Sequence, residues 1–264
     1  MRCEKALVSR VFSFVKKMSN YAEFVFFLLK YAIMLMESRL CSMLEKLNNR
    51  MIKTVVLYLV YFLYTVVASS LVASLNVENT AIVMMPADIL FAIFAVFMYH
   101  KELKECVNKL KKKKVSKIIF NVIIGVLSIL ALNVVMGLIT SAILPEYSMD
   151  SNTEAMLGLL KVSPIYAFFK TLIFAPIAEE ILFRESISSC VKNNVLFILL
   201  SAIIYTGMNF VFSSEALTFI DLLIYFMPAV LFSFLYVKND RNIIIIMMIK
   251  FIMQFVPFIV LLLS

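Results

Sequence analysis

Tryptophan is absent from this 264-residue sequence, which also has only four glycines, four cysteines and one histidine. So few glycines exclude a glycine-rich phosphate-binding loop. The cysteines, Cys3, Cys41, Cys106 and Cys190, show no CxxC spacing, so neither a zinc site nor a disulfide framework is expected. The single histidine, His100, excludes any site in one chain that needs two imidazoles, and no HExxH motif is present.

Charged residues are also scarce. Asp, Glu, Lys and Arg make up 16% of the chain, and hydrophobic residues make up 63%. An ordinary soluble domain has about 25% charged residues. A soluble protein of this length could not bury so much apolar surface. The composition therefore predicts a multi-pass protein of the cell membrane with an all-α fold, a polytopic bundle of transmembrane helices.

Apolar runs along the chain predict the number of spans, since a bilayer core of about 30 Å requires about 20 apolar residues per helix. We predict seven transmembrane helices, over 54–77, 81–99, 118–144, 164–184, 195–212, 216–237 and 242–263. A shorter apolar stretch, 21–36, is expected to lie on the membrane surface as an interfacial helix, although an eighth span there stays open.

Lysine and arginine are concentrated on one side of the predicted spans. Ten of them lie in residues 1–53 and eight in the loop 101–117, and the net charge is +8. Because cytoplasmic loops are enriched in these residues, the N-terminus is expected to be cytoplasmic. The basic loops are expected to contact the lipid bilayer, and no nucleic acid is predicted as a partner.

These features divide the chain into three predicted parts. Residues 1–53 form a basic cytoplasmic segment with the interfacial helix. Residues 54–117 form a first helical hairpin with its Lys-rich loop, and residues 118–264 form the helical core.

Several polar residues fall inside the apolar runs, where each charge costs about 2.5–3.5 kcal/mol on insertion scales. They are Asp88, Lys170, Glu179, Glu180, Arg184, Asn209, Asp221, Lys250 and Gln254. Glu180 and Arg184 share a helix face and are predicted to pair. Glu179 is rotated by about 100° from its neighbour and is expected to point into the bundle. Asp88 and Asp221 lack the sequence context of an aspartyl protease, so they are expected to contact Lys170 or polar backbone groups.

The string from Phe174 to Arg184 contains Pro-x-x-Glu-Glu-x-x-Phe-Arg. It resembles the first motif, EExxxR, of the CPBP family, the CAAX-protease and bacteriocin-processing intramembrane endopeptidases. The resemblance covers roughly residues 118–260. The family's later motifs, FxxxH and HxxxN, correspond here to 205–209 and 250–254.

The resemblance implies roles for the motif positions. In the family, the first glutamate and two histidines are taken to activate the hydrolytic water, through a metal or directly. By position, Glu179 would be the base, and Glu180 with Arg184 its supporting pair. However, the two histidine positions hold Asn209 and Lys250, and the family's asparagine position holds Gln254.

These replacements change what the site can do. Asparagine is a poor lone metal ligand, and a protonated lysine has no lone pair. No metal or cofactor is therefore predicted. We expect Lys250 to occupy the place of the family's water or metal and to pair with Glu179. Gln254, four residues later on the same helix face, is expected to donate to the same carboxylates.

The favoured interpretation is a CPBP-like membrane protein that is catalytically degenerate and acts by binding a membrane-bound peptide or protein. Two alternatives stay open. One is a divergent active intramembrane endopeptidase with Glu179 as its base. The other is a transporter-like component that uses the intramembrane charges as a relay.

Overall fold

A computed structural model describes residues 50–75, 80–143, 151–211 and 219–263, which belong to one compact unit, residues 49–264. All regular structure in these described ranges is helical, so the expected all-α fold is confirmed. The interfacial helix predicted over 21–36 lies outside the described residues.

Five described helices are long and apolar enough to cross a membrane. They are α4 (Arg50–Leu75), α5 (Ala81–Met98), α7 (Val115–Ile143), α12 (Phe219–Lys238) and α13 (Ile243–Leu263). Large apolar side chains face outward on these helices, for example Leu63 and Leu138, which are 58% and 67% exposed. Such a surface suits lipid and not water, so the chain is a multi-pass membrane protein. The side on which its N-terminus lies stays a prediction.

The other two predicted spans differ from these five. The first corresponds to α11 (Asn194–Val211), an apolar but shorter helix. The second corresponds to α9 (Pro164–Phe168), η2 (Phe169–Glu179), η3 (Ile181–Glu185) and α10 (Ser186–Cys190). The backbone stays helical at the junctions between these four pieces, so they form one winding stretch. We call residues 164–190 the central helix.

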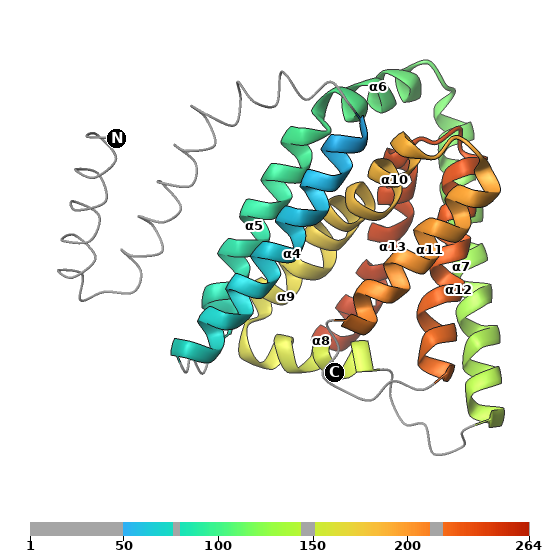
Figure 1. Cartoon of the computed structure of the whole chain (residues 1–264). Helices are drawn as coiled ribbons and strands as arrows, with labels where there is room; N and C mark the ends of the chain where they lie inside the picture. The colour runs from blue at the N-terminus through green and yellow to red at the C-terminus, as the bar shows by residue number, and fades with distance from the viewer. Residues whose placement is uncertain (1–49, 76–79, 144–150, 212–218, 264) are drawn as a thin grey trace, which may run out of the picture. The chain divides into compact units, whose positions relative to one another are not determined.

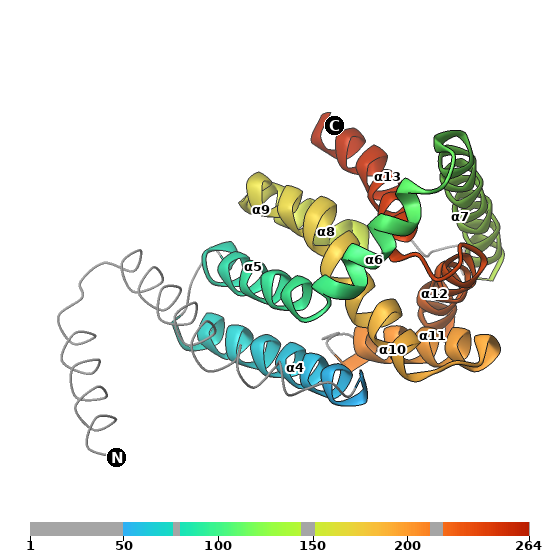
Figure 2. The same cartoon turned by 90° about the horizontal axis from the view of Figure 1, so that it is seen from above.

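The central helix lies inside the bundle (Figures 1 and 2). Along one path, α4 packs on α5, α5 on the central helix, and the central helix on α13; α13 then packs on α7, α7 on α12, and α12 on α11. The η3 part of the central helix also contacts α4 and α11. Two shorter helices, α6 (His100–Lys111) and α8 (Ser151–Val162), lie between the spans in the sequence. The central helix therefore packs against several other helices.

Close packing between α7 and α13 fixes the position of Lys250, a residue of the predicted site. Gly125 on α7 is buried, and a Cβ atom added there would collide with the end of the Ile249 side chain on α13. Ile249 is fully buried in the core together with Ile245 and Ile246. Because Lys250 follows Ile249 directly, the approach of these two helices sets the position from which Lys250 extends.

Most of the central helix has the wide turns of a π-helix, over Phe169–Glu179 and Ile181–Glu185. Pro176 lies within the first of these stretches and has no backbone N–H to donate. Neighbouring helices supply hydrogen bonds to carbonyls in the second stretch. Tyr58 donates to the Leu182 carbonyl at 2.9 Å, and Ser201 donates to the Phe183 carbonyl at 2.7 Å. These bonds matter because lipid offers backbone groups no partners. Such π-helical turns are rare and occur frequently at functional sites.

The loop between α12 and α13 contains two residues with positive φ, Asp240 (58°) and Arg241 (53°). Residues other than glycine rarely adopt this backbone conformation. The Arg241 guanidinium donates to the carbonyls of Ser188, Val191 and Lys192 at 3.2, 3.1 and 2.8 Å. Arg241 thus satisfies carbonyls where the central helix ends, and these bonds stabilise the loop conformation.

Candidate functional site

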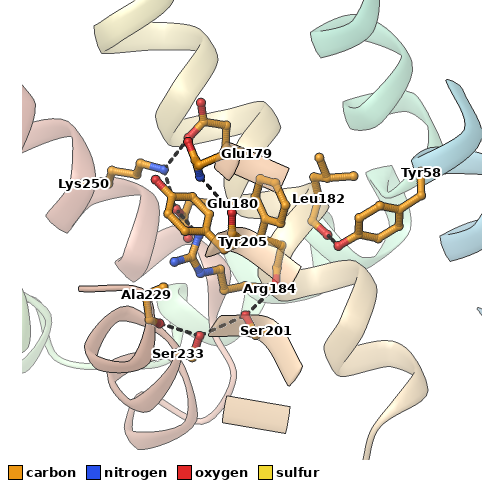
Figure 3. Close-up of polar contacts among 12 residues, drawn as sticks. Tyr58, Glu179, Glu180, Leu182, Arg184, Ser201, Tyr205, Ala229, Ser233 and Lys250 are labelled. Carbon is orange, nitrogen blue, oxygen red and sulfur yellow. Dashed lines mark hydrogen bonds and ion pairs between the residues drawn. The ribbon is translucent and has the colours of Figure 1, made fainter. Parts of the chain in front are cut away.

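Lys250, on α13, contacts both adjacent glutamates of the central helix (Figure 3). Its Nζ atom lies 2.8 Å from Glu179 Oε2 and 2.8 Å from Glu180 Oε1. Arg184 Nη1 donates to the same Glu180 oxygen at 3.0 Å, so two cations share that atom. The four side chains carry two positive and two negative charges. We call them the ion-pair cluster.

The ion-pair cluster is almost entirely removed from solvent and lipid. Glu180 and Arg184 are 0% and 1% exposed, and the Lys250 side chain is 8% exposed. The Glu179 side chain, at 23%, is the most accessible member. Buried charges persist only when they are paired and hydrogen-bonded. Removing any one member would therefore leave an uncompensated charge inside the bundle.

Tyr205, on α11, is the aromatic neighbour of the cluster. Its ring centroid lies 5.0 Å from the Arg184 guanidinium carbon and 5.8 Å from Lys250 Nζ. Both distances are within the range of cation–π attraction. The ring also packs edge-on against Phe183 at 5.0 Å. The sequence signal for Tyr205 is its place at the phenylalanine position of the segment 205–209, which corresponds to the family's FxxxH motif.

The structure confirms two expected ion pairs, Glu180 with Arg184 and Lys250 with Glu179. It adds a contact that helix spacing did not predict, between Lys250 and Glu180. The two glutamates therefore share one ammonium group instead of acting separately.

The expectation for Gln254 is wrong. Within the described part of the chain, Gln254 forms no hydrogen bond to either carboxylate, and its buried Oε1 atom has no partner. Asn209 does not join the cluster either, since its amide donates to the Tyr205 carbonyl of its own helix at 2.8 Å. The structure thus brings together four of the six motif residues.

A cavity of about 650 Å³ lies beside the cluster, between α7, α11, α12 and α13. Lys250, Tyr205 and Gln254 line one part of it, and Asn133, Thr140 and Tyr225 line others. Met136, Met253, Pro228 and Phe232 add apolar surface. Small-molecule and cofactor pockets are typically in this size range and combine an apolar lining with a few polar groups.

A second buried charge, Asp88 on α5, faces the central helix. Asp88 is 0% exposed, and its carboxylate accepts hydrogen bonds from Tyr166 at 2.6 Å, Lys170 at 2.8 Å and Tyr64 at 3.2 Å. The expected pairing of Asp88 with Lys170 is confirmed. These contacts join α4 and α5 to the central helix, which explains how a membrane helix accommodates Asp88.

The residues at the ion-pair cluster do not fit a metal ion. In the ranges that the structure describes, no group of three or more His, Cys, Asp and Glu side chains could hold one. A cation placed between the two carboxylates would meet the Lys250 ammonium, which already lies 2.8 Å from each of them. The charges would repel, and the ammonium offers no lone pair. These residues therefore do not support metal-assisted chemistry at the ion-pair cluster.

Residues 161–256 match a family model described as Type II CAAX prenyl endopeptidase Rce1-like. The match includes all six motif positions and confirms the resemblance to the CPBP family over this part of the chain. No curated protein and no solved structure matches the sequence.

Proposed function

We propose that this CAAX-protease-like membrane protein has lost peptide-bond hydrolysis and acts by binding a membrane-embedded peptide or protein in the cavity beside Lys250. One observation carries the proposal. The Lys250 ammonium lies 2.8 Å from carboxylate oxygens of both Glu179 and Glu180, where a hydrolase would need a water molecule and its base.

Glu179 is poorly suited to act as a base in this setting. A carboxylate held against an ammonium group favours its charged form and takes up a proton weakly. Imidazole cannot replace it, because His100 lies at the start of α6 and its Nδ1 atom is 2.7 Å from the Phe97 carbonyl. The cluster therefore supports the bundle's structure better than it supports general-base chemistry.

The cavity is suited to a bound chain. Among the described residues, Gln254 Oε1 is a buried acceptor without a hydrogen-bond partner, and the amide of Asn133 also lines the cavity. An unpaired buried acceptor costs about 1–3 kcal/mol. A backbone N–H of a bound peptide would satisfy Gln254, while the methionine and phenylalanine surfaces would contact its apolar side chains.

A cleavage assay tests the loss of hydrolysis. The purified protein is reconstituted in vesicles with a membrane-anchored fluorogenic peptide, with added zinc or with a chelator. We expect no release above that of the Glu179→Gln variant under either condition. If the unaltered protein cleaves the peptide and Glu179→Gln abolishes cleavage, the proposal is wrong and Glu179 acts as the base of a divergent endopeptidase.

Site-specific photo-crosslinking tests the binding role. A photoreactive residue replaces Tyr225, which lines the cavity, or Phe234 on the same helix, which is 48% exposed and does not line it. We expect a peptide or protein adduct from position 225 that excess transmembrane peptide suppresses. Equal adducts from both positions, or lipid adducts alone, would contradict a binding role for the cavity.

A further inference from the structure

A second pocket, of about 270 Å³, lies where α7 begins and α12 ends. It shares no lining residue with the cavity beside Lys250. Its charged lining residues are Lys113, Lys117, Lys238 and Asp240. Because three of these are cationic and one is anionic, the pocket has an excess of positive charge.

The one acidic group in the lining is already matched. Lys113 Nζ lies 2.7 Å from Asp240 Oδ2. This contact holds the pKa of the Asp240 carboxyl below its ordinary value. Lys117 and Lys238 form no ion pair with any part of the chain that the structure describes. These two lysines are therefore available to a ligand.

Two asparagines give the pocket a fixed polar wall. Asn121 Nδ2 donates to Asn239 Oδ1 at 2.8 Å, and Asn239 Nδ2 donates to the Leu235 carbonyl at 2.8 Å. Asn121 lines the pocket and retains a second N–H, because an amide group carries two. The wall is thus ordered before any ligand arrives.

Apolar residues complete the lining. Ile124 and Leu235 form part of it, and Phe120, which is 61% exposed, stands at the first turns of α7. The pocket therefore lies where apolar membrane helices meet the Lys-rich loop. Lipid headgroups are expected at this end of the helices. The phosphate group of a phospholipid would contact the lysines, while the acyl chains of the same lipid run along the apolar side. Free phosphate would leave that side unused.

We propose that this pocket binds the phosphate headgroup of an anionic phospholipid. Basic pockets between membrane helices are known to hold such headgroups. The site is separate from the ion-pair cluster, so the proposal does not depend on whether the protein hydrolyses or binds peptides.

Lipid retention measured by native mass spectrometry tests the proposal. The full chain is taken from vesicles that contain equal amounts of phosphatidylglycerol and phosphatidylcholine. We expect preferential retention of phosphatidylglycerol. A lysine near an anionic membrane surface typically contributes about fivefold to lipid affinity. If both lysines contact the headgroup, the Lys117→Gln/Lys238→Gln variant should bind phosphatidylglycerol about 25-fold more weakly.

A matched control removes the same charge outside the pocket. Lys111 and Lys112 are exposed residues that precede α7 and do not line the pocket. The Lys111→Gln/Lys112→Gln variant should weaken retention clearly less than the pocket variant, since these lysines lie near the pocket but do not line it. Phe120→Ala, which leaves the charge unchanged, should weaken retention by reducing the apolar contact.

Three outcomes would overturn the proposal. The first is equal retention of the two lipids by the unaltered protein. The second is equal loss in the two lysine pairs, which would indicate diffuse charge attraction instead of a pocket. The third is displacement of phosphatidylglycerol by millimolar inorganic phosphate, which would identify a site for free phosphate. Unchanged melting temperatures confirm that the variants are folded.

Discussion

Lys250→Met should destabilise the bundle more than the double change Lys250→Met/Glu179→Gln. The single change leaves the Glu179 carboxylate without its cation, while Glu180 keeps Arg184 at 3.0 Å. The double change removes the charge at both positions and leaves one glutamate paired with one arginine. The order of the two costs therefore reports whether Lys250 and Glu179 interact.

The structure sets the expected size of the effect. At 2.8 Å and an effective dielectric constant of about 20, the attraction is about 6 kcal/mol before desolvation is subtracted. Removing one partner of a buried pair costs about 3–5 kcal/mol. Because the Glu179 side chain is 23% exposed, we expect about 3 kcal/mol for Lys250→Met. The double-mutant cycle should give a coupling energy of about 1–3 kcal/mol.

Denaturant titration of the protein in mixed micelles, followed by circular dichroism, measures these free energies of unfolding. The control cycle uses Lys113 and Asp240, whose charged atoms are 2.7 Å apart but whose side chains are 23% and 76% exposed. Its coupling should stay below about 1 kcal/mol, because solvent screens exposed pairs. A coupling below about 0.5 kcal/mol between Lys250 and Glu179 would refute the contact on which the proposed function depends.

Three further changes test other parts of the structure in the same assay. Gly125→Leu should lower the free energy of unfolding by at least about 2 kcal/mol, since the new side chain collides with Ile249. The control Gly137→Leu, on the same helix, meets open space and should cost less than about 1 kcal/mol. Equal costs would contradict the close approach of α7 and α13. Arg241→Gln should cost about 2 kcal/mol of stability through lost hydrogen bonds to backbone carbonyls. An unchanged free energy of unfolding would show that these bonds do not stabilise the loop between α12 and α13. Asp88→Asn should cost about 2–3 kcal/mol by leaving a lysine without its carboxylate, and a neutral effect would contradict that pair.

Helix spacing was sufficient to predict part of the site. Glu180 and Arg184 are four residues apart on one helix, so their contact follows from local geometry. The contact between Lys250 and Glu179 followed from the position of Lys250 in the family motif. The apolar runs similarly predicted the five long helices of the described ranges, because run length and hydropathy depend only on the sequence.

Features that depend on three-dimensional packing were not predictable in this way. The wide turns of the central helix reduce the rotation between neighbouring residues, so the α-helical angle assumed for Glu179 and Glu180 does not apply. The position of Gln254 also depended on packing that helix spacing does not describe. An i to i+4 spacing places it on the face of Lys250, but the lysine side chain alone reaches the carboxylates.

The shared ammonium of Lys250 has a consequence for the biogenesis of the protein. The central helix emerges from the ribosome before α13 and carries Glu179, Glu180 and Arg184. Each charge opposes entry into the bilayer by about 2.5–3.5 kcal/mol, and Arg184 can neutralise only one of the two glutamates. The Glu179 carboxylate can therefore acquire its cation only when α13 arrives. A nascent chain stopped before Lys250 should present an unpaired Glu179 carboxylate to membrane quality-control proteases.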